Sequence, residues 1–158
     1  MDFGQLKSIW VSEGPGQPMQ SLSHCQAHQG LGLEGDRYSK NQGFWQTVKK
    51  PRLTIRDVSL IQFSAIQMTS FTEADTRRNL VIECERPLID LVGVAFQIGE
   101  AQFLGIEDCT PCQRPSDLIG RDGFAMGFQG RGGLRAQVIK SGQMVVGDGL
   151  YLLETLKT

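Results

Sequence analysis

Residues 94–106, which read VAFQIGEAQFLGI, give the clearest indication of the fold class. Larger apolar side chains alternate there with small or polar ones, and Gly99-Glu100 interrupts the alternation near its middle. A period of two is the pattern of a half-buried strand, and a glycine at the reversal is typical of a tight turn. The stretch therefore predicts two antiparallel strands joined as a hairpin.

Short apolar runs between glycines continue this pattern on both sides of the hairpin. Ser141-Gly142 is a second turn signal, and we expect it to join its flanking strands into another hairpin. Helix is expected only at residues 60–68 and in a short turn at residues 87–91, which a proline opens. Further strands are expected at residues 7–12, 80–84, 134–139, 144–146 and 150–154.

Glycine content agrees with a fold that has many turns. The chain holds 19 glycines in 158 residues, and glycine is unfavourable inside helices and strands. Residues 26–38 are expected to form a strand edge and loop, and residues 39–52 a polar surface loop. About seven short strands with little helix predict a mainly β (α+β) fold, a barrel or a sandwich, in one domain over residues 1–158.

Composition and charge exclude several classes of protein. Hydrophobic residues make up 40% and charged residues 21%, as in ordinary globular domains. With 16 Lys and Arg against 17 Asp and Glu the net charge is −1, so we expect no nucleic-acid partner. No apolar run approaches the roughly 18–20 residues of a membrane span, and we expect no membrane association. Four cysteines without a secretory signal indicate free thiols in a reducing cytoplasm.

Cys109-Thr110-Pro111-Cys112 is the strongest local feature. Two thiols at this spacing can ligate a metal, form a redox disulfide or supply one reactive thiolate. Pro115 and the glycines beyond it argue against the strand-to-helix context of a thioredoxin-like motif. A zinc site would need further ligands. The alternative to a chemical role is that both thiols are buried apolar groups that only pack in the core. The additional zinc candidates are His24, Cys25 and His28.

Three other segments carry polar groups suited to an anionic ligand. Arg77-Arg78-Asn79 enters an expected strand, and paired guanidinium groups can hold a phosphate or a pterin-like ligand; the alternative is a solvated turn. The glycine-rich residues 30–38 contain the charge pair Asp36 and Arg37, and residues 127–135 place Arg131 in a flexible loop. Neither segment has the pattern of a dinucleotide-binding or P-loop motif, and each alone is compatible with an ordinary turn.

Taken in order, four segments resemble the MOSC domain, named for the C-terminal domain of molybdenum-cofactor sulfurase. They are GLEGDRY (32–38), TRRNLVIE (76–83), LVGVAFQIGEAQFLGIEDCTPCQRP (91–115) and GRGGLRAQVIKSGQMVVGDGL (130–150). The resemblance covers nearly the whole chain and implies a stand-alone, small bacterial-type member. It also implies a MOSC-like β-barrel with a few short helices.

The resemblance further implies a cysteine tied to sulfur transfer or to the molybdenum of a pterin cofactor. In related reductases, such as the mitochondrial amidoxime-reducing component, the MOSC cysteine ligates the metal, and Cys112 is the matching position. Cys109 is a neighbour found in some small members. Arg78 and Asn79 match the family's RN pair, with Arg77 beside them, and by resemblance they hold the cofactor's phosphate and pterin. Tyr38 departs from relatives that have histidine there.

These expectations leave three functions open. The first is a molybdenum-cofactor-binding protein, a candidate catalytic subunit for reducing N-hydroxylated compounds, with Cys112 as metal ligand. The second is a carrier of a persulfide on Cys112 for the assembly of cofactors or metal–sulfur clusters. The third is a non-catalytic zinc or protein-binding domain. The sequence contains no flavin, iron–sulfur or pyridoxal-phosphate domain, so we expect a separate redox partner or cysteine desulfurase.

Overall fold

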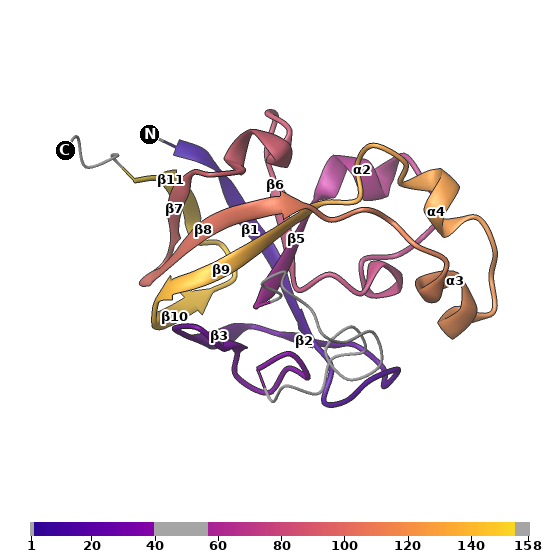
Figure 1. Ribbon diagram of the computed structural model, residues 1–158, viewed down its shortest axis with the longest axis horizontal. Coiled ribbons are helices and arrows are strands. Elements are labelled where there is room, and N and C mark those ends of the chain that lie inside the picture. Colours follow the sequence, from indigo (N-terminus) through magenta and orange to yellow (C-terminus); the bar gives the residue numbers. More distant parts are fainter. Residues whose placement is uncertain (1, 40–56, 154–158) are drawn as a thin grey trace.

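The computed structural model describes residues 2–39 and 57–153 (Figure 1). The surface loop expected at residues 39–52 lies outside these residues except for Ser39. Within the described part, three short helices accompany the strands: α2 (Phe63–Gln67), α3 (Arg114–Ile119) and α4 (Phe124–Gly127). The strands are β1 (Asp2–Val11), β2 (Gln20–Leu22), β3 (His24–His28), β4 (Gly32–Leu33), β5 (Val58–Gln62), β6 (Leu80–Glu83), β7 (Ala95–Ile98), β8 (Ala101–Asp108), β9 (Leu134–Lys140), β10 (Gly142–Val145) and β11 (Gly149–Leu152).

Seven of these strands form a closed barrel. They run in the order β11-β7-β8-β9-β5-β6-β1, and β11 also pairs with β1, which closes the sheet. Closure removes the unpaired edges that an open sheet would expose. β2 pairs with the end of β1, and β10, β3 and β4 form a separate three-stranded sheet. The mainly β, barrel-like fold expected from the sequence is confirmed.

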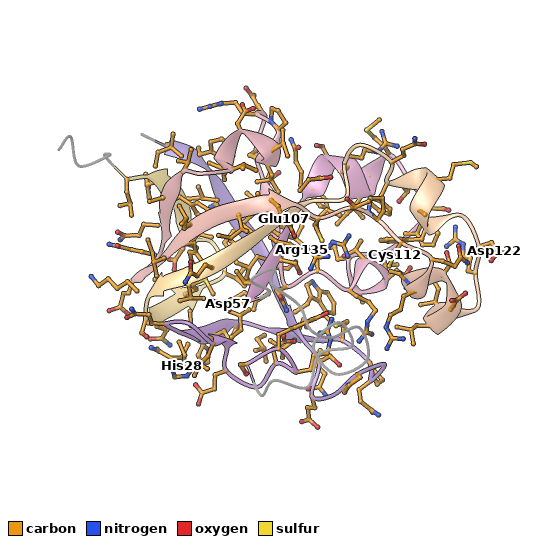
Figure 2. The ribbon with its side chains drawn as sticks, in the orientation of Figure 1. His28, Asp57, Glu107, Cys112, Asp122 and Arg135 are labelled. Atoms are coloured by element: carbon orange, nitrogen blue, oxygen red, sulfur yellow. The ribbon has the colours of Figure 1, made fainter. Side chains whose placement is uncertain are left out.

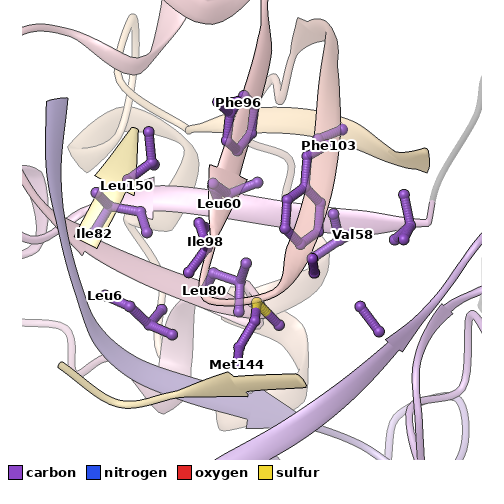
Figure 3. Close-up of a cluster of buried hydrophobic side chains, with 14 of the residues drawn as sticks. Leu6, Val58, Leu60, Leu80, Ile82, Phe96, Ile98, Phe103, Met144 and Leu150 are labelled. Carbon is purple, nitrogen blue, oxygen red and sulfur yellow. The ribbon is translucent and has the colours of Figure 1, made fainter. Parts of the chain in front are cut away.

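The hairpin predicted at residues 94–106 is confirmed with its turn. β7 and β8 are antiparallel, and Phe96 lies directly opposite Phe103. The two rings stack with centroids 5.5 Å apart, and both side chains are fully buried. Gly99 takes the left-handed φ of 60° at the reversal, a conformation that favours glycine. Figure 3 shows Phe96 and Phe103 in the cluster that fills the barrel.

The second predicted hairpin, around Ser141-Gly142, is wrong. β9 is hydrogen-bonded to β8 along one edge and, at residues 134–136, to β5 along the other. Nearer the turn, the Val138 N–H donates to Asp57 and its carbonyl accepts from the Gly30 N–H, so these groups are not available to β10. β10 instead pairs with β3, with Met144 opposite Cys25. A local turn signal cannot reveal that closure of the barrel has already used both edges of a strand.

The helix predicted at residues 60–68 is half wrong. β5 takes the first part of this run, and only Phe63–Gln67 is helical as α2. Leu60 faces the barrel core, whereas Ile61 packs into a second cluster outside it with Val81 and Phe124. A strand buried on both faces is a continuous apolar run, which periodicity alone does not separate from a buried helix.

The expectation that Pro115 excludes a helix after the cysteine pair is also wrong. α3 begins at Arg114 with Pro115 in its first turn, where proline is favoured because its missing N–H has no helical partner anyway. α3 ends at Gly120, whose φ of 69° is left-handed. In Figure 1 α2, α3 and α4 gather beyond one end of the barrel, at the right of the view.

Helices in the described part are short. None of them, within residues 2–39 and 57–153, has the length and hydrophobicity needed to cross a membrane.

Asp57 provides a test of how a buried carboxyl affects stability. Its carboxylate accepts a 3.0 Å hydrogen bond from the Val138 N–H, and burial raises its pKa. Because the folded pKa lies above the unfolded one, ionisation costs stability as pH rises through the folded value. We expect Asp57→Asn to keep the hydrogen bond and to unfold at higher urea than wild type at neutral pH. The difference should shrink toward about pH 3.5, where the wild-type carboxyl is protonated.

Urea titrations of both proteins across this pH range check the prediction. Glu100→Gln is the control, because Glu100 is exposed and its substitution should change little. A lower urea midpoint for Asp57→Asn at neutral pH would show that the ionised carboxylate stabilises the fold.

Candidate functional site

One pocket gathers most of the candidate residues of the sequence analysis. It lies where β5, β6 and β9 meet the segment between β8 and α3. Its empty space, with the open solvent at its mouth included, is about 590 Å³. We call it the arginine pocket; its lining residues are Arg37, Tyr38, Val58, Ser59, Arg77, Arg78, Asn79, Cys109, Cys112, Arg114, Pro115 and Arg135.

The arginine pocket has a strong positive character. Five of its lining residues are arginines, and within the described part of the chain no aspartate or glutamate lines it. Acidic side chains lie close to two of these arginines: Arg37 Nη1 is 3.1 Å from Asp36, Arg135 Nε is 3.6 Å from Glu107, and Asp36 also acts on Arg77. Guanidinium groups are suited to bidentate binding of phosphate and carboxylate. The pocket is therefore suited to an anion.

Arg77 is the residue that points most clearly to an anionic ligand. It follows the 3₁₀ helix η1 (Ala74–Thr76), and among described residues it is the only non-glycine with positive φ, 57°. Its Nη1 donates to the Gln17 carbonyl at 2.9 Å, while its Nη2 is buried and has no hydrogen-bond partner in the described part of the chain. Burial, followed by repulsion from Arg37 and Arg114, lowers the Arg77 pKa to about 10. An anion would satisfy this donor and offset the repulsion.

Arg78 lines the same pocket but directs its guanidinium group to the backbone. Nε donates to the Gly132 carbonyl at 2.8 Å, Nη1 to the Thr76 carbonyl at 3.2 Å and Nη2 to the Cys109 carbonyl at 3.4 Å. The residue is 8% exposed. These bonds connect the start of β6 to the segment before β9 and to the cysteine loop. Arg78 thus positions the wall that carries the thiols.

Asn79 is likewise engaged with the protein. Its side-chain oxygen accepts hydrogen bonds from the Ser59 N–H and hydroxyl, at 3.1 and 3.3 Å, and its amide donates to the Trp10 carbonyl at 3.0 Å. These contacts join β5, β6 and β1 at the base of the pocket. Asn79, which was expected to hold a cofactor, therefore holds three strands together.

The cysteine loop is fixed to the barrel at its first thiol. The Cys109 N–H donates to the Gly133 carbonyl at 2.8 Å, and the side chain is 3% exposed. Gly132 passes so close that an added Cβ would lie 2.2 Å from the Cys109 carbonyl oxygen, so only glycine fits there. Cys112 is partly exposed and lies just before α3. The expectation that both thiols are buried apolar groups therefore fails for Cys112.

The other two cysteines differ from this pair. Burial raises the pKa of Cys25 and of Cys84 to about 11, and repulsion from Glu34 and Asp36 contributes at Cys25. At neutral pH both remain thiols, which are poor nucleophiles.

The structure brings together Arg37, Arg77, Arg78, Asn79 and Cys112 from the residues expected at the site. Asp36 lies behind Arg37, fully buried, and accepts the Ser12 N–H at 3.0 Å. Tyr38 also lines the pocket, its ring 4.8 Å from the Arg37 guanidinium.

Arg131 lies outside the arginine pocket. It lines a separate, smaller hollow beside Asp108, and its Nε and Nη2 both donate to the Gly127 carbonyl. The structure therefore does not bring Arg131 together with the residues of the arginine pocket.

The expected zinc site is not assembled. His24, Cys25 and His28 lie in β3, which belongs to the smaller sheet, whereas Cys109 and Cys112 follow β8. Figure 2 shows His28 well away from Cys112, at the lower left. In residues 2–39 and 57–153 no group of three or more His, Cys, Asp or Glu side chains could hold a metal ion.

Sequence reasoning missed Arg114 and Arg135 as pocket residues. Arg114 follows the cysteine pair directly and could have been found from that adjacency. Arg135 lies opposite Glu107 across β9 and β8, and Figure 2 shows both in the middle of the view. Its membership depends on strand pairing, which no local pattern gives.

Comparison with known proteins identifies the family. The MOSC domain family matches residues 47–151, more than half of the chain, and a comparison with curated proteins gives no match. The YuaD protein of Bacillus subtilis is similar in structure, with a TM-score of 0.78 at 14% identity and 94% of both chains covered. YiiM of Escherichia coli has a TM-score of 0.64 at 17% identity, covering 98% of this chain and 72% of that one. Such low identities show the fold alone, but the family match shows that the chain belongs to the MOSC domain family.

Proposed function

We propose that this chain binds a molybdenum cofactor in the arginine pocket, with Cys112 as the protein's ligand to the metal. The observation that carries the proposal is the buried Nη2 of Arg77, a charged donor that none of the described residues satisfies, in the same pocket as the partly exposed Cys112. A ligand that joins an anionic group to a thiophilic metal would satisfy both residues.

The chemistry of the donors fits this ligand. Thiolate is a soft ligand suited to metals that favour sulfur, and guanidinium groups match phosphate oxygens. The MOSC family's association with the molybdenum cofactor agrees with these residues.

Each residue has a separate task in this proposal. Arg77 binds the cofactor's phosphate, with Arg37 and Arg114 adding positive charge nearby. Arg78 and Asn79 position the wall through their backbone contacts. The bound group would supply two-electron redox chemistry, for which N-hydroxylated compounds are the candidate substrates and a separate redox protein the electron donor.

The test is the cofactor content of protein purified from a host that makes molybdenum cofactor. We expect molybdenum by elemental analysis and a fluorescent pterin after oxidation. Cys112→Ser should lose molybdenum, and Arg77→Ala should lose pterin and molybdenum together. Arg131→Ala, outside the pocket, and Cys84→Ser are the matched controls and should keep both. Wild-type protein without molybdenum or pterin would overturn the proposal.

Sulfur carriage on Cys112 is the second candidate. It is favoured by the contrast between thiols: burial suppresses ionisation of Cys25 and Cys84, whereas Cys112 opens onto the pocket. Incubation with a cysteine desulfurase and cysteine should add about 32 Da, one sulfur atom, to the wild type. An adduct that persists in Cys112→Ser would exclude Cys112 as the carrier.

A further inference from the structure

The two pocket thiols lie between a strand and a helix. β8 ends at Asp108, Cys109 and Cys112 follow, and α3 begins at Arg114. Neither cysteine is in a disulfide, and both line the arginine pocket. This is the strand-to-helix context of a dithiol motif, which the sequence appeared to lack because of Pro115.

The thiols differ in access, which sets their order of reaction. Cys112 is partly exposed at the pocket wall, whereas Cys109 is 3% exposed and its backbone is held by Gly133 and Arg78. A disulfide from solution would therefore meet Cys112 first. The fixed Cys109 would act second, within the protein.

The surrounding charges select among disulfides. The five arginines of the pocket, with no described acidic side chain in the lining, produce a positive potential at the thiols. Such a field raises the local concentration of anions and the rate at which they arrive, and salt screens it. Anionic disulfides should thus react faster than cationic ones.

We propose that Cys109 and Cys112 form a dithiol that exchanges with small anionic disulfides, of which glutathione disulfide is one. The Cys112 thiolate attacks one sulfur of the disulfide, forms a mixed disulfide and expels one thiolate. The Cys109 thiolate then attacks Cys112 Sγ, closes the Cys109–Cys112 disulfide and expels the second thiolate. The protein loses two electrons and two protons, and the small disulfide is reduced to two thiols.

Closure would use the same sulfur that the proposed function assigns to the metal, and in this respect the inference rests on that function. The oxidised chain could not offer Cys112 as a ligand, nor could Cys112 carry a persulfide. Exchange would thus make cofactor binding depend on the thiol–disulfide balance.

The experiment uses the full chain with Cys25→Ala and Cys84→Ala, so that only the pocket thiols remain. With glutathione disulfide, the intact mass should fall by two hydrogens, and dithiothreitol should reverse the change. Adding Cys109→Ser should trap one glutathione on Cys112, while adding Cys112→Ser should give almost no adduct because Cys109 is buried. A stable glutathione adduct on the chain that has both thiols would overturn the role of Cys109.

Charge selectivity is tested with glutathione disulfide against cystamine, which is cationic. The rate of each disulfide with the protein is divided by the rate of the same disulfide with a neutral small thiol. This ratio corrects for the intrinsic reactivity of the disulfide. We expect a preference of about tenfold for the anion at low salt, falling as salt rises. Arg77→Ala should reduce it, and Arg131→Ala should not. A preference for glutathione disulfide that changes neither with salt concentration nor in Arg77→Ala would overturn the electrostatic part of the proposal.

The two proposals fail separately. Molybdenum content is measured in protein that is kept reduced. Formation of the Cys109–Cys112 disulfide is measured by intact mass. A chain that closes its disulfide but never holds molybdenum overturns only the proposed function. A chain that holds molybdenum but never closes overturns only the exchange.

Discussion

Arg77→Ala should weaken the binding of inorganic phosphate to the pocket about 10- to 100-fold and leave the barrel folded. The buried Nη2 has no hydrogen-bond partner among residues 2–39 and 57–153, so we expect it to donate to the ligand. A hydrogen bond that involves a charged group contributes roughly 1.5–3 kcal/mol, and each 1.4 kcal/mol is about a factor of ten in affinity. Isothermal titration with phosphate at fixed low salt measures the change.

Arg77→Gly separates the binding effect from the backbone effect. It removes the same guanidinium group but accepts the φ of 57° without strain, whereas alanine keeps that strain, about 1 kcal/mol. We expect equal loss of phosphate binding in both variants and a higher urea midpoint for glycine.

Two outcomes bear on the assignment of Arg77. Arg131→Ala is the control and should bind phosphate as the wild type does, because Arg131 lies outside the arginine pocket. Unchanged phosphate binding in both Arg77 variants would remove Arg77 from the site.

Local patterns predicted the strands better than their partners. The hairpin at residues 94–106 was found because its two strands pair with each other, so alternation and turn lie within one short window. β9 and β10 are also adjacent in sequence, yet each pairs elsewhere. Their partners follow from closure of the barrel, a long-range property.

The candidate site shows the same difference between features that a local pattern predicts and features that depend on long-range pairing. Arg77 and Arg78 were both predicted as ligand-binding residues because they directly precede a predicted strand. Their different directions could not be predicted, because they depend on the left-handed backbone at Arg77 after η1. The Arg77 guanidinium keeps a donor that has no partner within residues 2–39 and 57–153, and the Arg78 guanidinium donates to three carbonyls. Arg135 joins them only through the pairing of β9 with β5 and β8.

Arg78→Ala should lower the free energy of unfolding by about 3 kcal/mol, an effect that Arg77→Ala should not share. It leaves the Gly132, Thr76 and Cys109 carbonyls without their buried charged donor. Losing such a donor costs roughly 1–3 kcal/mol per group, and the losses are not additive. At about 2–4 °C per kcal/mol for a chain of this size, the melting temperature should fall by roughly 6–12 °C.

Arg78→Lys distinguishes the fork of hydrogen bonds from the charge alone. Lysine keeps the positive charge but cannot reach three carbonyls in the fixed planar geometry of a guanidinium group. We therefore expect Arg78→Lys to recover less than half of the lost stability in urea titrations. Full recovery would mean that charge, and not the fork, holds the cysteine loop. If Arg78→Ala kept wild-type stability but lost phosphate binding, Arg78 would be a ligand residue, and the division of roles between Arg77 and Arg78 would be wrong.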